Sequence, residues 1–251
     1  MPLLSLIVIT RNEEASIERC LHSAAFADEV VVVDNHSADK TVEIARRLGA
    51  KVISAPDWPG FGPQKNRALD AATGEWVLSL DADEWIEQPL ADEIKAAMRD
   101  PAAADGYEMP RRSRFCGKVV GHCGWWPDYV LRLWRRGRGR FVDVPVHERV
   151  KVDGRVSRFA SPIEHEAIVD LADARDKSSR YAAAAAAELV SQGKHSSRTK
   201  ALVRAGAAFV RTYVWRAGFL DGATGFQVAR YNSDYTYQKW ARVADATTRN
   251  G

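Results

Sequence analysis

Three carboxylates packed into four positions, Asp81, Asp83 and Glu84, directly follow the apolar run 76–80. A short apolar run that ends in polar residues is typical of a buried strand, and side chains at the end of such a strand face the crevice where open α/β sheets bind ligands. Two aspartates one residue apart can hold a hard cation, Mg²⁺ or Mn²⁺, which in turn can hold the phosphates of a nucleotide. The alternative interpretation is a solvated acidic turn, with Glu84 and Glu87 stabilising the N-terminus of a following helix.

The elements that must position these carboxylates alternate between strand and helix. Apolar runs predict strands at residues 4–9, 30–33, 51–53 and 76–80, and periodic segments predict helices at 13–25, 39–48 and 64–72. Asn12 is expected to cap the first helix, and Gly49 and Gly74 are expected to close the other two. This alternation with short connections predicts an α/β fold with a mostly parallel sheet flanked by helices.

Polar residues follow three of the predicted strands, at positions 10–13, 34–37 and 81–83. Because the carboxyl ends of parallel strands meet at one edge of a sheet, we expect the three groups to gather there. This convergence indicates a ligand site more strongly than the aspartate pair does alone, since a short motif by itself is weak evidence.

The pattern changes after about residue 100. Residues 107–165 are rich in Arg, Trp, Gly and Pro, and helices are expected at 181–190, 199–215 and 227–241. We therefore predict three regions, which are the first half of an α/β domain at 1–105, its second half at 106–170, and a helical C-terminal extension at 171–251.

Composition and charge limit the classes of protein that fit. The 251 residues carry a net charge of +3, so the overall charge does not require a nucleic-acid partner. Cys20, Cys116 and Cys123 form neither an even disulfide set nor a zinc motif, so we expect reduced thiols in a cytosolic protein. The N-terminus lacks the features of a signal peptide, and no uncharged apolar run reaches the roughly 18 residues of a transmembrane helix.

Four motifs in the first 100 residues resemble the inverting family 2 glycosyltransferases, which have the GT-A fold. In chain order these motifs are Ser5 to Glu14, Val30 to Thr41, Gln64 to Ala68, and Leu80 to Glu84. Their order and spacing both match the family. The resemblance implies that residues 1–105 bind a nucleotide-sugar donor, commonly a UDP-sugar, with a divalent metal, and that residues 106–170 bind the acceptor.

The resemblance also implies roles for individual residues. Thr10 and Glu13 would line the nucleoside pocket, and Asp34 would hydrogen-bond the base. Asp83 would be the principal metal ligand, while Asp81 would face the ribose or the sugar and stand beside Asp83 as a second ligand. The implied donor-binding residues are Thr10, Arg11, Asn12, Glu13, Asp34, Ser37, Lys65 and Asp81.

Simpler interpretations exist for several of these positions. Asp34 and Asp39 also suit a turn and a helix cap, and Lys65 and Arg67 also suit a solvated helix face. A dinucleotide-binding domain would need a glycine-rich turn after the first strand, but residues 10–15 contain no glycine. The acidic residues there would also repel a pyrophosphate at the helix N-terminus.

The motifs of the second half resemble the subgroup that adds sugars to lipopolysaccharide core, including enzymes that transfer glucose from UDP-glucose to an inner-core heptose. These motifs are Gly124 to Asp128, Leu131 to Arg135, Val146 to Glu148, and Ile163 to His165. An inverting transferase needs a carboxylate as general base. The Glu-Asp pair that many family members present is absent here, so Glu148 is the first candidate and Asp128 the second.

His147 and His165 are candidates to complete the metal shell or to contact the diphosphate, the alternative being structural histidines. Basic residues between 111 and 140 are interleaved with tryptophans, and Arg forks match phosphate while Trp faces suit sugar rings. The expected acceptor-binding residues are Trp125, Trp126, Arg132 and Arg135. Single-stranded nucleic acid also binds aromatic and basic residues, but the nucleotide-sugar half argues against it, so no nucleic-acid partner is expected.

The C-terminal third contains no acidic residue between Glu188 and Asp221, while six basic residues and several aromatics lie there. A basic helix with aromatics is typical of a segment that lies on an anionic membrane surface. This predicts a peripheral protein on the inner face of the cytoplasmic membrane. The alternative is an ordinary packed helix with exposed arginines.

These observations predict an inverting, metal-dependent glycosyltransferase that moves a sugar, glucose by expectation, from a UDP-sugar to a lipid-linked glycan such as lipopolysaccharide inner core. One alternative is a polyprenyl-phosphate glycosyltransferase, whose acceptor is already ionised and needs no base. Another is a non-catalytic membrane-surface binding module with a degenerate site.

Overall fold

The computed structural model of the chain describes residues 3–142 and 149–249. His147 and Glu148 lie outside these described residues. The chain divides into two compact units, the first formed by Met1–Arg111 with Tyr129–His165 and the second by Arg112–Asp128 with Glu166–Gly251. The domain boundaries expected from the sequence stay a prediction.

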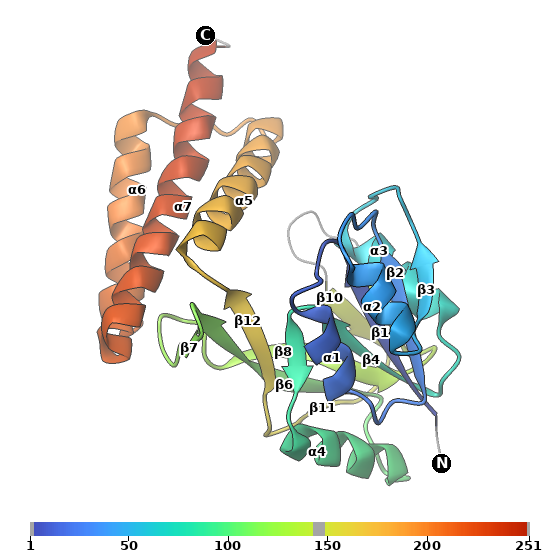
Figure 1. Ribbon diagram of the computed structural model, residues 1–251. Helices are drawn as coiled ribbons and strands as arrows, with labels where there is room; N and C mark the ends of the chain where they lie inside the picture. The colour runs from blue at the N-terminus through green and yellow to red at the C-terminus, as the bar shows by residue number, and fades with distance from the viewer. Residues whose placement is uncertain (1–2, 143–148, 250–251) are drawn as a thin grey trace. The chain divides into compact units, whose positions relative to one another are not determined.

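A mixed sheet forms the centre of the first unit, and its N-terminal part is parallel (Figure 1). The parallel strands are β3 (Lys51–Ser54), β2 (Glu29–Asp34), β1 (Leu4–Thr10) and β4 (Trp76–Asp81), in that spatial order. The sheet continues through β8 (Asp128–Arg135), β6 (Gly106–Phe115), β12 (Ile163–Ile168) and β5 (Glu84–Ile86), and β11 (Val156–Arg158) pairs with β6. β4 pairs antiparallel with β8, and β12 pairs antiparallel with β5. A separate hairpin joins β9 (Gly139–Val142) to β10 (Arg149–Val152).

Helices cover both faces of this sheet. α1 (Ile17–Ser23), α2 (Thr41–Arg47) and α4 (Gln88–Arg99) pack with Leu6, Val8 and Leu78 in one core. α3 (Phe61–Ala71) packs with Ile7 and Val33 in a second core on the opposite face. Strands that are buried on both faces have near-continuous apolar sequences, which explains the runs in β1, β2 and β4. The predicted α/β fold, with a mostly parallel sheet between helices, is confirmed.

The first helix begins four residues later than predicted, at Ile17 rather than residue 13. Asn12 does not cap it but has a positive φ of 57°, and its side-chain oxygen accepts a hydrogen bond from the backbone N–H of Ala38 at 2.8 Å. The backbone N–H of Glu13 donates to Thr41 Oγ1 at 2.7 Å. Residues at the start of α2 and in the loop before it therefore bind the polar groups of residues 12 and 13, and this long-range bonding holds them out of a helix.

The two predicted helix-closing glycines have different roles. Gly49 has a φ of 82° after the end of α2, as expected of a residue that closes a helix. Gly74 does not close α3, because the residue after that helix, Ala72, is already extended. The backbone N–H of Gly74 donates to Ser5 Oγ at 2.8 Å, and a Cβ at this position would lie 2.7 Å from the same atom. This glycine therefore permits close packing against β1.

The second unit is mainly helical, as predicted for the C-terminal extension (Figure 1). Its elements are β7 (Lys118–Val119), α5 (Leu171–Ser191), α6 (Arg198–Val210), the π-helical turn η1 (Arg211–Trp215), the 3-10 turn η2 (Gly218–Asp221) and α7 (Gly222–Arg249). α5 begins ten residues before the predicted alanine-rich segment because the Asp170 side chain caps it, accepting from the backbone N–H groups of Ala172 and Asp173. No helix within residues 3–142 and 149–249 is long and apolar enough to cross a membrane.

Substituting Gly225 with alanine is expected to destabilise the second unit. A Cβ at Gly225 would lie 1.8 Å from the carbonyl oxygen of Gly218, so α7 and η2 would have to separate. Overpacking of this kind costs about 1–3 kcal/mol or more, which urea unfolding followed by helical circular dichroism would measure. Gly206→Ala in α6 is the matched control, because no atom lies within 4 Å of its Cβ position and alanine stabilises a helix interior by about 0.5–1 kcal/mol. Equal effects of the two changes would contradict the close-packing argument.

Candidate functional site

The polar ends of the parallel strands lie together at one edge of the sheet, as the sequence predicts. In the strand register Thr10 is the partner of Asp34, and Ile9 is the partner of Asp81. The three groups of residues expected to form a ligand site are therefore adjacent, because β1 lies between β2 and β4.

Asp81 is held between two cations. Lys65 Nζ lies 2.7 Å from Asp81 Oδ1, and Arg132 Nη2 lies 2.5 Å from Asp81 Oδ2. Both cationic side chains are buried, with 2% of Lys65 and 7% of Arg132 exposed. Burial by itself raises the pKa of the Asp81 carboxyl, but the charges and hydrogen bonds of Arg132 and Lys65 outweigh burial and hold this pKa well below its usual value. Asp81 therefore stays ionised and fixed.

Glu84 joins this cluster from the start of β5. Arg132 Nη2 lies 2.7 Å from Glu84 Oε1, Arg111 Nη1 lies 3.6 Å from the same atom, and Glu84 Oε2 accepts a hydrogen bond from the backbone N–H of Asp81. Burial alone lowers the pKa of Arg132, but the two carboxylates raise it above its usual range. The interpretation of Glu84 as part of a solvated turn is wrong, because its side chain is fully buried and belongs to a strand.

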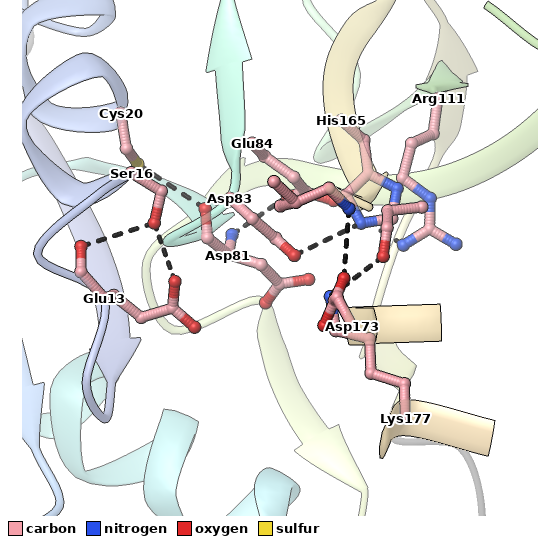
Figure 2. Close-up of polar contacts among 12 residues, drawn as sticks. Glu13, Ser16, Cys20, Asp81, Asp83, Glu84, Arg111, His165, Asp173 and Lys177 are labelled. Carbon is pink, nitrogen blue, oxygen red and sulfur yellow. Dashed lines mark hydrogen bonds and ion pairs between the residues drawn. The ribbon is translucent and has the colours of Figure 1, made fainter. Parts of the chain in front are cut away.

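Asp83 has a different partner from its two acidic neighbours. Its Oδ2 lies 3.5 Å from Nε2 of His165, and both side chains are partly exposed, at 29% for Asp83 and 15% for His165 (Figure 2). His165 is the register partner of Glu84 in the antiparallel pair β12–β5. The pairing of these two strands therefore places an imidazole beside Asp83, although 82 positions separate the two residues in the chain.

The chemistry of these donors fits a divalent cation that also binds a substrate. Among the described residues no group of three or more His, Cys, Asp or Glu side chains is arranged to hold a metal by itself. Mg²⁺ is commonly bound through one or two carboxylates together with substrate phosphates. Asp83 supplies a carboxylate of that kind at a partly exposed position, and His165 Nε2, 3.5 Å from its Oδ2, is a nitrogen donor beside it.

On the β2 side of the site, polar side chains hold the loop that follows β2 by hydrogen bonds. Asp34 accepts from the hydroxyl of Ser37 at 2.5 Å and from its backbone N–H at 3.1 Å, and Ser37 Oγ accepts from the backbone N–H of Asn12 at 2.8 Å. The turn role considered for Asp34 is therefore present. Thr10 Oγ1 is buried without a hydrogen-bond partner among the described residues. Arg11 is exposed.

The simpler interpretation of Lys65 and Arg67 places both on a solvated face of one helix. That interpretation is wrong for Lys65, which is buried against Asp81. It is correct for Arg67, whose guanidinium pairs with the exposed Asp57 at the surface. The two residues lie on different sides of α3, because two positions along a helix correspond to a large rotation about its axis.

The residues expected to bind the acceptor do not form a single group within either unit. Trp125 packs against Phe115 in the second unit, where Trp126 is exposed and Asp128 partly buried. In the first unit, Arg132 belongs to the acidic cluster described above, and the Arg135 guanidinium stacks over Trp76 at the other end of β4, 4.5 Å from the ring centroid. An acceptor role for these residues stays a prediction.

Two features of the structure were missed by the sequence interpretation. Arg111 reaches Glu84, and the only signal for it was its place in a basic run. In the second unit His122 Nδ1 lies 2.8 Å from Asp221 Oδ1, and Asp221 Oδ2 accepts from the backbone N–H of His122. This pair fastens the loop that carries Trp125 to η2, and no spacing rule links positions so far apart.

Comparison with known proteins gives consistent matches. The family model described as glycosyl transferase family 2 matches residues 5–138. An uncharacterised glycosyltransferase of Rickettsia typhi is 32% identical over 90% of this chain and 81% of its own length. The lipopolysaccharide core biosynthesis glycosyltransferase LpsC of Rhizobium meliloti is 28% identical over 96% of this chain and 94% of its own. Among solved structures, glucosyl-3-phosphoglycerate synthase of Mycobacterium tuberculosis with Mn²⁺ and UDP-glucose is 27% identical over 45% of this chain and 44% of its own, with a TM-score of 0.38.

Proposed function

The chain belongs to glycosyl transferase family 2. From this premise we propose that it transfers a hexose from a UDP-sugar to a lipid-linked saccharide of the lipopolysaccharide core type. The hexose is expected to be glucose. The observation that carries the proposal is that the two aspartates at the end of β4 have different partners. Asp81 is neutralised by Lys65 and Arg132, whereas the neighbouring Asp83 faces His165 at a partly exposed position.

Asp83 and His165 are the proposed protein ligands of Mg²⁺ or Mn²⁺, and His147, which lies outside the described residues, is a further candidate. When bound, such a cation would stabilise the negative charge that develops on the departing diphosphate. Asp81 is proposed to accept hydrogen bonds from the ribose or the sugar. A carboxylate has about four lone-pair sites, so its bonds to Lys65 and Arg132 leave acceptor capacity.

The nucleoside is proposed to bind beside β1 and β2. Asp34 can accept a hydrogen bond from the imide N–H of uracil in addition to its bonds from Ser37. Thr10 and Glu13 stand at the same strand ends. Arg11 and Asn12 are exposed there and complete the proposed donor-binding set.

The reaction is proposed to be a single in-line displacement. The acceptor hydroxyl oxygen attacks the anomeric carbon, its proton passes to a carboxylate, and the bond to the diphosphate breaks so that UDP leaves with the electron pair. Glu148 is the proposed base and Asp128 the second candidate. Asp81 would remain ionised throughout, because its pKa is held well below its usual value.

The similarity to LpsC, which covers nearly the whole of both chains, supports the proposed acceptor class. Trp125 and Trp126 are proposed to stack on sugar rings, and the arginines of the second half to bind phosphate or carboxylate groups. A lipid-linked acceptor implies that the enzyme works at the inner face of the cytoplasmic membrane.

A transfer screen tests this proposal. The full chain with Mn²⁺ is expected to consume UDP-hexoses in preference to GDP-, dTDP- and CMP-sugars, and calorimetry is expected to show Mn²⁺-dependent UDP binding. If no nucleotide sugar is consumed and UDP does not bind with Mn²⁺, the proposal is wrong and the non-catalytic module is favoured.

Glu148→Gln in the same assay tests the base. We expect the transfer rate to fall by about 100- to 10,000-fold, the usual contribution of a general base, with UDP affinity unchanged because the carboxylate acts on the acceptor. An unchanged rate would show that Glu148 is not the base. A fall in rate on Asp128→Asn would then assign the role to Asp128, and an unchanged rate there too would favour an acceptor that is already ionised, as in transfer to polyprenyl phosphate.

A further inference from the structure

α6 has a narrow buried face made of small residues. Ala201, Ala205 and Ala208 are buried, as is Thr212 in the η1 turn that continues α6, and their spacing of four, three and four places them on one side of the helix. α6 packs against α7 within the second unit (Figure 1). The small side chains allow the two helices to approach closely. Phe209 at the edge of this face is half-buried against Phe226 of α7, and the remaining residues of α6 are exposed.

The side of α6 opposite α7 is apolar. Val203 and Val210 of α6 and Val214 of the following η1 are exposed by 67%, 45% and 52%, and their spacing of seven and four places them on one stripe. Leu202 beside this stripe is 65% exposed. A helix on the surface of a globular protein normally presents polar residues there. The outward stripe of α6 therefore requires a separate explanation.

The turn after α6 extends the apolar surface. Trp215 is 79% exposed, and Phe219 and Leu220 are exposed by 51% and 61%. Single exposed apolar residues are ordinary on protein surfaces, but the seven large ones within residues 202–220 are concentrated in one segment, as at an interaction site. We call these seven residues the α6 surface: Leu202, Val203, Val210, Val214, Trp215, Phe219 and Leu220.

Three cations gather beside the α6 surface. The Arg204 guanidinium lies 3.6 Å from the centroid of the Trp240 ring, and Lys239 Nζ on α7 lies 6.0 Å from the centroid of the same ring. Arg211 follows α6 directly in the chain. Burial lowers the pKa of Lys239, and the charges of Arg204 and Arg211 lower it further. These three cations therefore repel one another, and an anion placed among them would relieve the repulsion.

We propose that the α6 surface and the cations Arg204, Arg211 and Lys239 dock the protein on an anionic phospholipid bilayer. Apolar side chains would enter the headgroup region while the cations bind lipid phosphates, as in helices that lie in a membrane interface. Charge complementarity favours this occupant over a second copy of the chain, because residues 189–220 contain no Asp or Glu and a two-fold contact would oppose like charges. The inference concerns the second unit and does not depend on the identity of the donor.

Vesicle co-sedimentation of the full chain tests the inference. We expect binding to vesicles of phosphatidylglycerol and phosphatidylcholine, with weak binding to phosphatidylcholine alone. The triple variant R204Q/R211Q/K239Q is expected to lose about 100-fold in partitioning, from roughly a factor of five for each cation near an anionic surface. The variant W215S/F219S/L220S should lose binding to a similar degree, with its helical circular dichroism unchanged because these side chains are exposed.

The matched control is R46Q/R99Q/K151Q, which removes the same charge from exposed positions of the first unit. An equal loss in the control would show attraction by net charge alone and would overturn the docking surface. The absence of binding of the wild-type protein to anionic vesicles would also overturn it. If the protein self-associates, and W215S/F219S/L220S abolishes that association while vesicle binding persists, the surface would instead be assigned to a second copy of the chain. Mn²⁺-dependent UDP binding, measured on the same variants, should be unchanged, so a failure here is distinct from a failure of the proposed transferase function.

Discussion

Replacing Asp83 with alanine is expected to abolish Mn²⁺-assisted UDP binding and to lower kcat/KM by roughly 100-fold or more, the scale of losing one group that stabilises developing charge. The physical reason is the neutralisation of its neighbours. Asp81 and Glu84 bond to Lys65 and Arg132, whereas Asp83 faces only the imidazole of His165 among the described ion pairs. Calorimetry with UDP, with and without Mn²⁺, measures the change directly.

Asp57→Ala is the matched control for this experiment. It removes the same charge, but Asp57 pairs with Arg67 on the surface of α3 and its side chain is 64% exposed. We expect its Mn²⁺-assisted UDP affinity to stay within about twofold of wild type, because exposed ion pairs contribute little. If Asp83→Ala binds UDP with Mn²⁺ as well as this control does, Asp83 is not the metal ligand.

Replacing Asp81 with asparagine is expected to lower the free energy of unfolding by about 3 kcal/mol, the lower end for removing one partner from a buried ion pair, because Lys65 and Arg132 are buried whereas the Asp81 side chain is 29% exposed. The amide has nearly the same size, so no cavity forms. The change would leave the buried ammonium of Lys65 without its carboxylate, and would leave the guanidinium of Arg132 with Glu84. Urea unfolding at neutral pH measures the loss.

The same carboxylate makes the first unit sensitive to acid. The pKa of Asp81 is held well below its usual value in the folded state, so the unfolded chain binds more protons than the folded one as the pH falls below about 3.9. The stabilisation is therefore complete above that pH and is lost as the pH falls toward the folded-state pKa. Asp81→Asn should remove this part of the pH dependence.

Asp70→Asn is the control for stability. Asp70 forms an ion pair with Arg140 in which both side chains are more than half exposed, and such pairs contribute about 0–1 kcal/mol. A loss as large as that of Asp81→Asn would contradict the argument that burial of Lys65 and Arg132 makes the Asp81 interaction strong.

Local sequence predicted the parallel half of the sheet well, and the reason is physical. Strands buried on both faces need continuous apolar runs, so β1, β2 and β4 are visible in the sequence. The ends of helices were harder to predict. α1 begins at Ile17 because the backbone N–H groups of Asn12 and Glu13 bond to Ser37 and Thr41, which are 25 and 28 positions away. Such bonds leave no periodic signal.

Sequence alone determined that Asp81 and Asp83 lie at the end of a buried strand, beside the strand ends that carry Thr10 and Asp34. It could do so because order along the chain and apolar patterning fix the positions of the strands. Only the tertiary structure decided which aspartate is neutralised. Lys65 comes from α3 and Arg132 from β8, and both reach Asp81, while His165 of β12 faces Asp83. Interactions between charges depend on distance and burial in space, and neither quantity is written in the spacing of residues along the chain.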